Sequence, residues 1–67
     1  MEELALARDM AISLGASITD NDVGFIACFD SEEIASSYVE NVNDTWDDVT
    51  AEDQEKCAVV VTVASLM

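Results

Sequence analysis

The chain has 67 residues, about half of them apolar, with two glycines and no proline. This composition predicts that residues 1–67 form a single compact domain with one small core and no linker or low-complexity tail. Fifteen acidic residues face only two basic ones, Arg8 and Lys56, which gives a net charge of −13. That charge excludes direct binding to nucleic acid or to an anionic membrane, since both depend on Lys and Arg contacts.

The first half of the chain predicts a helix followed by a β-hairpin. Residues 2–14 carry apolar side chains at the three- and four-residue spacing of one helix face, and Gly15 stands where a glycine commonly ends a helix. Residues 16–19 are a candidate short strand, and the Asp20-Asn21-Asp22 sequence indicates a turn. Residues 23–29 are rich in β-forming side chains and predict the second strand of the hairpin.

The second half predicts a long helix, a short helical turn and a last strand. Asp30 and Ser31 are both candidate N-caps for an amphipathic helix over residues 32–47, with a capping-box pattern if Asp30 is the cap. A further cap-like pattern predicts a short helical turn within residues 50–56. Residues 57–66 contain a run of valines and predict a well-covered, near-central strand.

These elements predict an α+β fold in the order α-β-β-α-α-β. The expected architecture is a small three-stranded sheet with two main helices and one short helical turn packed mainly on one face. If the last strand neighbours residues 23–29, the helical crossover between them makes that pair parallel. The order of the strands in the sheet stays open at this point.

The sequence offers little to an enzyme, and we expect no catalytic residue, no cofactor and no metal site. Histidine is absent, which removes the usual general base near neutral pH. No glycine-rich phosphate loop is present. The Asp20-Asn21-Asp22-Val23-Gly24 stretch superficially resembles a Ca²⁺ loop, but it places Val23 where an oxygen ligand is needed.

Cys28 and Cys57 both lie in apolar predicted strands and are expected to be small buried side chains. A disulfide between neighbouring strands is the alternative. The first residues are acidic and lack the basic region of a secretory signal, and no apolar run is long enough to span a bilayer. We therefore expect a cytoplasmic protein with reduced cysteines and no contact with a membrane.

The informative feature is a row of carboxylates that no basic residue interrupts. Along the helix over residues 32–47 they lie opposite the apolar face, and they continue into the residues that follow. Carboxylates one helical turn apart, about 5–6 Å, could imitate the step between phosphates of a nucleic-acid strand. The candidate partner-binding residues are Glu33, Glu40, Asp44, Asp47, Asp48, Glu52 and Asp53.

In chain length, acidity and mixed helix and strand pattern, with acidic stretches at 31–48 and 50–55, the sequence resembles small phage-encoded inhibitors of the anti-CRISPR and DNA-mimic type. The resemblance implies a stoichiometric inhibitor that acts in the host cytoplasm. It implies a basic nucleic-acid-binding protein or complex as partner, such as a CRISPR surveillance complex whose recognition of target DNA is blocked. Separately, we expect a monomer and not a dimer.

Two other interpretations remain open. A halophile-type domain would spread acidic residues evenly and fold only in concentrated salt. An antitoxin-like or accessory subunit could use the small-residue stripe of Ala7 and Ala11 to pack against another copy, without mimicry of nucleic acid. Tyr38 and Trp46 are expected in the core, whereas an exposed Trp46 would indicate a binding anchor.

Overall fold

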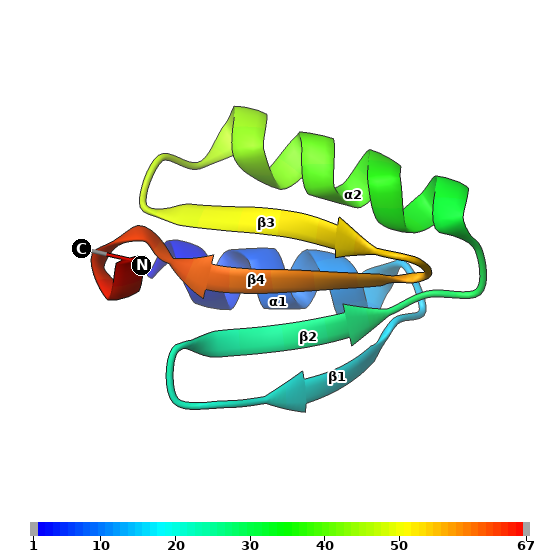
Figure 1. The fold of residues 1–67 in the computed structure, drawn as a ribbon, viewed down its shortest axis with the longest axis horizontal. Helices are drawn as coiled ribbons and strands as arrows, with labels where there is room; N and C mark the ends of the chain where they lie inside the picture. The colour runs from blue at the N-terminus through cyan, green and yellow to red at the C-terminus, as the bar shows by residue number, and fades with distance from the viewer. Residues whose placement is uncertain (1, 67) are drawn as a thin grey trace.

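The computed structural model describes residues 2–66, which form two helices, a four-stranded antiparallel sheet and a short 3₁₀ helix (Figure 1). The strands lie in the order β1-β2-β4-β3. The fold is therefore α+β as predicted, with one strand more than the three expected. In chain order the elements are α1 (Glu3–Ser13), β1 (Ser17–Asp20), β2 (Gly24–Cys28), α2 (Glu32–Thr45), β3 (Val49–Gln54), β4 (Cys57–Thr62) and η1 (Val63–Leu66).

Strand β3 and the turn that follows it occupy residues 50–56, which were predicted to form a short helical turn, and that prediction is wrong. Val49 and Ala51 are buried while Glu52 is exposed, which is the two-residue alternation of a strand. A two-residue turn at Glu55, whose φ is 57°, leads into β4. Because β3 reverses the chain before β4 begins, β2 and β4 are antiparallel, and the predicted parallel pairing is wrong as well.

Helix α1 ends as the sequence predicts. Gly15 adopts a φ of 86°, a conformation that glycine tolerates best. Its amide donates to the carbonyl of Ile12 at 2.9 Å, and the amide of Ala16 donates to the carbonyl of Ala11 at 3.1 Å. This pair of bonds is the Schellman motif, and it turns the chain from α1 into the sheet.

The hairpin of β1 and β2 also agrees with the prediction. The side-chain oxygen of Asn21 accepts hydrogen bonds from the amides of Val23 and Gly24, both at 2.9 Å, and so holds the turn. Gly24 lies so close to β4 that an added Cβ atom would collide with the carbonyl oxygen of Val60. The pairing of β2 with β4 therefore requires glycine at this position.

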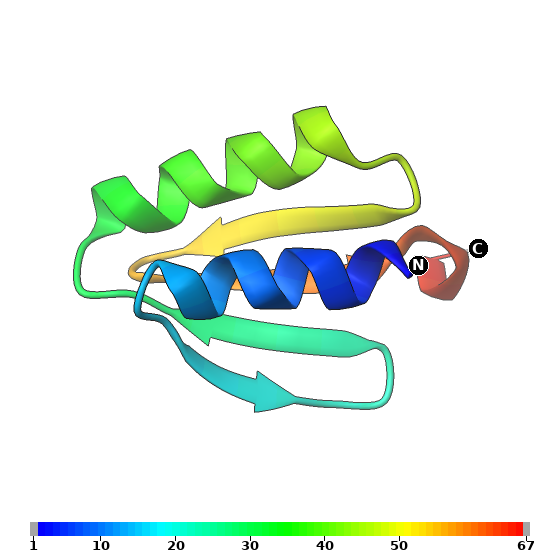
Figure 2. The same ribbon diagram turned by 180° about the vertical axis from the view of Figure 1, so that it is seen from behind.

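One core joins both helices to the sheet. The Tyr38 hydroxyl of α2 donates to the carbonyl of Ala7 in α1 at 2.6 Å, and Figure 2 shows α1 crossing in front of the strands. Ala7 and Ala11 are fully buried inside the molecule. The small-residue stripe therefore packs within the chain and is not exposed to another copy. The buried residues are Ala7, Ala11, Phe25, Ala27, Phe29, Ala35, Tyr38, Val39, Val42, Val49, Ala51, Ala58 and Val60.

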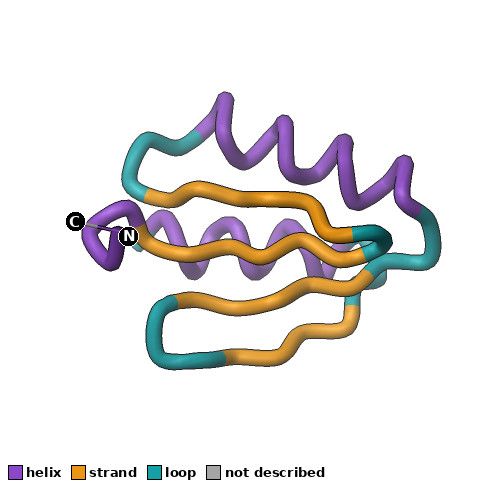
Figure 3. The backbone as a smooth tube through the Cα atoms, in the orientation of Figure 1, coloured by secondary structure: helices purple, strands orange, loops and turns teal. Residues whose placement is uncertain are grey.

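The sheet residues that alternate with these core positions are only half-buried. They include Ile26 of β2 and its cross-strand partner Val59 of β4, together with Val61. The tube in Figure 3 shows that short loops connect the strands and helices. Strand β4 ends at Thr62, and the residues predicted to extend it form η1 instead.

Candidate acidic interface

Helix α2 carries three of the seven predicted partner-binding residues, Glu33, Glu40 and Asp44, and its start is fixed by Ser31. The Ser31 hydroxyl accepts a hydrogen bond from the amide of Ile34 at 3.2 Å. Ser31 is therefore the N-cap, and the capping box predicted from Asp30 does not form. Glu32 and Glu33 lie in the first turn, where the helix dipole favours negative charge.

The buried side of α2 determines which way its carboxylates point. Tyr38 and Val42 are fully buried against the sheet and α1. Glu33, Glu40 and Asp44 are all exposed, and at 100° per residue they lie on the opposite side of the helix. They form an outward ridge of carboxylates, and the exposure predicted for these three side chains is confirmed.

The segment Asp30–Glu55, which we call the acidic segment, contains ten of the fifteen acidic residues and no Lys or Arg. All ten are exposed. They include the seven predicted partner-binding residues, and the full set is Asp30, Glu32, Glu33, Glu40, Asp44, Asp47, Asp48, Glu52, Asp53 and Glu55.

The seven predicted residues do not all share one face. Those on α2 point away from the sheet, whereas Glu52 alternates with the buried Ala51 and lies across from Val59 on the half-buried face of the sheet. Asp53 lies near the end of β3 and is exposed. The α2 ridge and the β3 carboxylates thus lie on two sides of one edge of the molecule, along which α2 runs beside β3 in Figure 1.

Asn43 joins those two parts, a role that no local pattern in the sequence indicates. Its side-chain amide donates to the carbonyl of Ala51 at 3.0 Å, and its side-chain oxygen accepts from the Ala51 amide at 2.9 Å. These are the bonds that another strand would make at the edge of β3. Asn43 therefore seals this edge and fixes α2 relative to β3.

Glu3 of α1 also contacts the acidic segment, although it is not among the partner-binding residues predicted from the sequence. Its Oε1 atom accepts a hydrogen bond from the amide of Asp48 at 3.1 Å. Glu2, Glu3 and Asp48 also line one shallow hollow in the described part of the chain. The start of α1 is thus continuous with the acidic segment, and a tertiary contact of this kind leaves no sequence signal.

Asp20, in the edge strand β1, has a basic partner. Arg8 of α1 binds Asp20 of β1 in a two-bond ion pair, with nitrogen to oxygen distances of 2.9 and 3.0 Å. The hydrogen bond from Arg8 holds the pKa of Asp20 below its usual value, and the same bond raises the pKa of Arg8. Both side chains are exposed enough for solvent to screen the pair.

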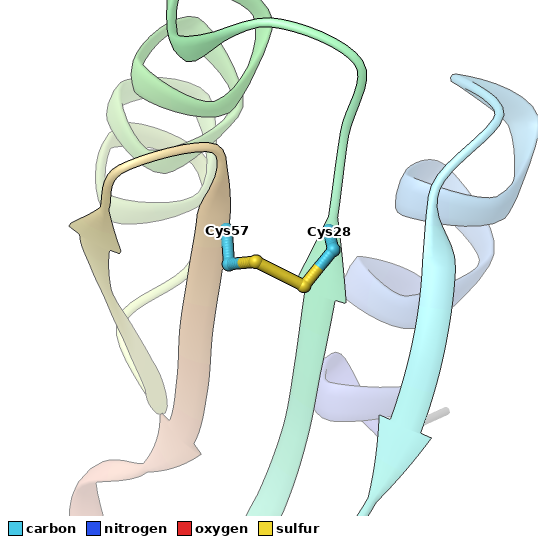
Figure 4. Close-up of a disulfide and its surroundings, with 2 residues drawn as sticks. All are labelled: Cys28 and Cys57. Atoms are coloured by element: carbon cyan, nitrogen blue, oxygen red, sulfur yellow. A yellow bond between two sulfur atoms is a disulfide. The ribbon is translucent and has the colours of Figure 1, made fainter.

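Cys28 and Cys57 form a disulfide, so the expectation of two reduced core thiols is wrong. The two residues are directly opposite each other in β2 and β4, as Figure 4 shows, with their Cα atoms 4.0 Å apart. Both are half-buried rather than in the core, because they alternate with the buried Ala27 and Ala58. Their apolar neighbours in sequence gave no sign of this placement.

Among the described residues, no group of three or more Cys, Asp or Glu side chains is arranged to hold a metal ion. The helices in this part of the chain are too short or too polar to cross a bilayer. Trp46 caps the end of α2 and is half-buried against the core.

No protein-family model, no curated protein and no solved structure matches this chain.

Proposed function

We propose that this protein is a non-enzymatic acidic binding protein that occupies the nucleic-acid-binding surface of a basic partner. The acidic segment carries the proposal, because its ten exposed carboxylates have no Lys or Arg among them in sequence. The partner class is a protein or complex that binds DNA or RNA, of which a CRISPR surveillance complex is one example. The partner's arginines and lysines would meet carboxylates in place of phosphates.

The stability of α2 does not account for the position of its carboxylates. Asp44 lies in the last turn, at the end of the helix where the dipole favours a cation. Glu40 and Asp44 are also one turn apart, where like charges repel. Residues that oppose folding are more readily explained by a binding role, which supports an interface on this ridge.

The uneven distribution of charge supports partner binding over adaptation to high salt. Adaptation to high salt predicts carboxylates spread evenly, whereas Asp30–Glu55 holds two thirds of them in 26 residues. The proposal includes the packing expected from the sequence, with both helices mainly against one face of the sheet. That packing leaves the α2 ridge and the exposed carboxylates of β3 accessible to a partner.

The test is capture of partners from a host lysate at low salt on the immobilised, oxidised protein. We expect the captured proteins to bind nucleic acid, and we expect added duplex DNA or RNA to displace them at unchanged ionic strength. Capture of proteins that nucleic acid does not displace would contradict mimicry. Folding only in concentrated salt would instead favour the halophile interpretation.

We place the protein in the cytoplasm, as expected from its sequence, and we assign binding to the oxidised form, in which Cys28 and Cys57 are joined. Stable disulfides are typical of oxidising compartments. The redox state of the protein therefore matters to the proposal.

A further inference from the structure

The Cys28–Cys57 disulfide closes a covalent loop that coincides with the acidic segment. The two cysteines are 29 residues apart in sequence, and the residues between them include all of Asp30–Glu55. The loop therefore contains α2, β3 and ten of the fifteen carboxylates. The five other acidic residues and Arg8 lie outside it.

We propose that this disulfide is a redox switch for the acidic interface, which is ordered when the cysteines are oxidised and is lost when they are reduced. The inference rests on the proposed function, since it concerns the regulation of the same surface. Repulsion among the carboxylates favours expansion of the segment, and the covalent bond limits how far the unfolded segment can expand. Oxidation would then turn binding on, and a reducing cytoplasm would turn it off.

The position of the disulfide allows a reductant to reach it. Cys28 and Cys57 are half-buried on the sheet face opposite the core residues, and their neighbours across the strands, Ser17 and Gln54, are exposed. Phe29 donates to the carbonyl of Lys56 at 2.8 Å, so the cysteines occupy a pair without backbone hydrogen bonds between them, where side chains approach most closely. Reduction therefore breaks no ladder bond directly.

The reductant that we propose is a dithiol. One dithiol thiolate attacks a sulfur of the disulfide, forms a mixed disulfide and releases the other cysteine as a thiolate. The second thiol of the reductant then displaces the first cysteine. Two electrons and two protons pass to Cys28 and Cys57, which become thiols, and the reductant becomes a disulfide.

The length of the loop that the disulfide closes sets how much reduction lowers the stability of the fold. Cross-linking a loop of about 30 residues shifts the unfolding equilibrium by roughly 10²- to 10³-fold. A domain of about this size has only marginal stability, so a shift of that size is enough to populate the unfolded state. The two-state element is the fold of the acidic segment, which carries the interface.

The experiment compares oxidised and dithiothreitol-reduced protein in low-salt buffer. Hydrogen exchange of α2 and β3 amides and Trp46 fluorescence report the order of the segment, and the nucleic-acid-binding protein captured from lysate reports binding. We expect reduction to raise the exchange rate of these amides at least 100-fold and to weaken binding at least 10-fold. About 1 M salt should restore much of the order by screening the carboxylates.

The matched control is the double variant Cys28→Val, Cys57→Val, which keeps an apolar cross-strand pair but has no covalent bond. It should behave like reduced protein whether or not dithiothreitol is present. If the oxidised protein binds and reduction changes neither its binding nor its hydrogen exchange, the switch is overturned and the proposed function stays intact. A change in only one of the two measurements also overturns the switch. No binding by the oxidised protein would instead remove the proposed function and the switch together.

Discussion

The two edges of the molecule are stabilised by different kinds of contact. On the side of β1, an ion pair between Arg8 and Asp20 joins helix to strand. On the side of β3, the neutral side-chain amide of Asn43 joins α2 to the strand. The acidic side is therefore held without using its own carboxylates, which leaves them available to a partner.

The edge strands are protected differently as well. Asn21 donates to the carbonyl of Gly24, so by alternation the outward backbone groups of β1 belong to Ile18 and Asp20. That edge has four residues and a charge pair, two ordinary defences against unwanted strand pairing. The edge of β3 is longer, and Asn43 covers its middle. A side-chain seal matters most where the strand is long.

The sharpest way to test this division of roles is charge reversal on the α2 ridge. The double variant Glu40→Lys, Asp44→Lys should weaken partner binding by about 30-fold, roughly 2 kcal/mol, because two attractions become repulsions. The same variant should stabilise the fold by about 0.5 kcal/mol, since a cation suits the helix C-terminus. Binding is measured by titration and stability by urea unfolding.

The control for charge reversal is the double variant Asp9→Lys, Asp22→Lys, which changes net charge equally outside the acidic segment. Glu2 and Glu3 are unsuitable, because Glu3 contacts Asp48. Similar loss of affinity in both double variants would mean that net charge, and not the ridge, attracts the partner.

Breaking the seal of β3 comes next in size. Asn43→Ala should destabilise the fold by about 1.5 kcal/mol, because the Ala51 amide and carbonyl lose their partners. Asn43→Asp keeps the acceptor for the Ala51 amide but loses the donor to its carbonyl, and places two oxygens together. Urea unfolding followed by Trp46 fluorescence measures both. Stability equal to the parent protein in both variants would show that the seal contributes nothing.

The Tyr38 hydroxyl links α2 to α1, and its removal should lower the stability of the fold somewhat less than Asn43→Ala does. Tyr38→Phe loses the bond to Ala7 and should destabilise the fold by about 1 kcal/mol. Burial raises the pKa of Tyr38 well above its ordinary value of about 10. The unfolded chain therefore ionises first, and stability falls as pH rises above about 10.

Tyr38 is the chain's one tyrosine, so Tyr38→Phe should remove this alkaline loss. Unfolding curves at neutral pH and at pH above about 10 measure the difference. An equal alkaline loss in the variant would assign it to another group.

The smallest expected effect is at the turn between β3 and β4. Glu55 adopts a φ of 57°, which asparagine tolerates better than glutamate. Glu55→Asn should stabilise the fold by about 0.5 kcal/mol and remove one charge from the acidic segment. Glu55→Gln, which removes the same charge without easing the backbone, is the control, and an equal gain in both would assign the effect to charge.

The parts of the fold that the sequence predicted are those with a strong local signal. The periodicity of α1 and α2, the Gly15 stop and the Asn21 turn all act over a few residues. Strand β3 was missed because the cap-like pattern at Thr50 and Asp53 outweighed the alternation of Val49 and Ala51. Its turn also lacks the glycine or asparagine that indicates a hairpin.

The sequence predicted which carboxylates of the candidate site are exposed, but not the contacts that hold the site together. The exposure of Glu33, Glu40 and Asp44 follows from helix periodicity and charge. The roles of Asn43 and Glu3 depend on residues brought together only by the tertiary fold. The expected cytoplasmic location favoured reduced cysteines over a disulfide. Neither the 29-residue spacing nor the apolar surroundings could place the two cysteines opposite each other.

The close approach of the backbones at Gly24 and Val60 offers a way to recognise distant relatives. No side chain larger than hydrogen fits there, so glycine should persist while the surrounding acidic surface diverges. Four residues after it comes a cysteine whose covalent partner opens the last strand. A search for this constellation of glycine and paired cysteines would be independent of the acidic composition of the chain.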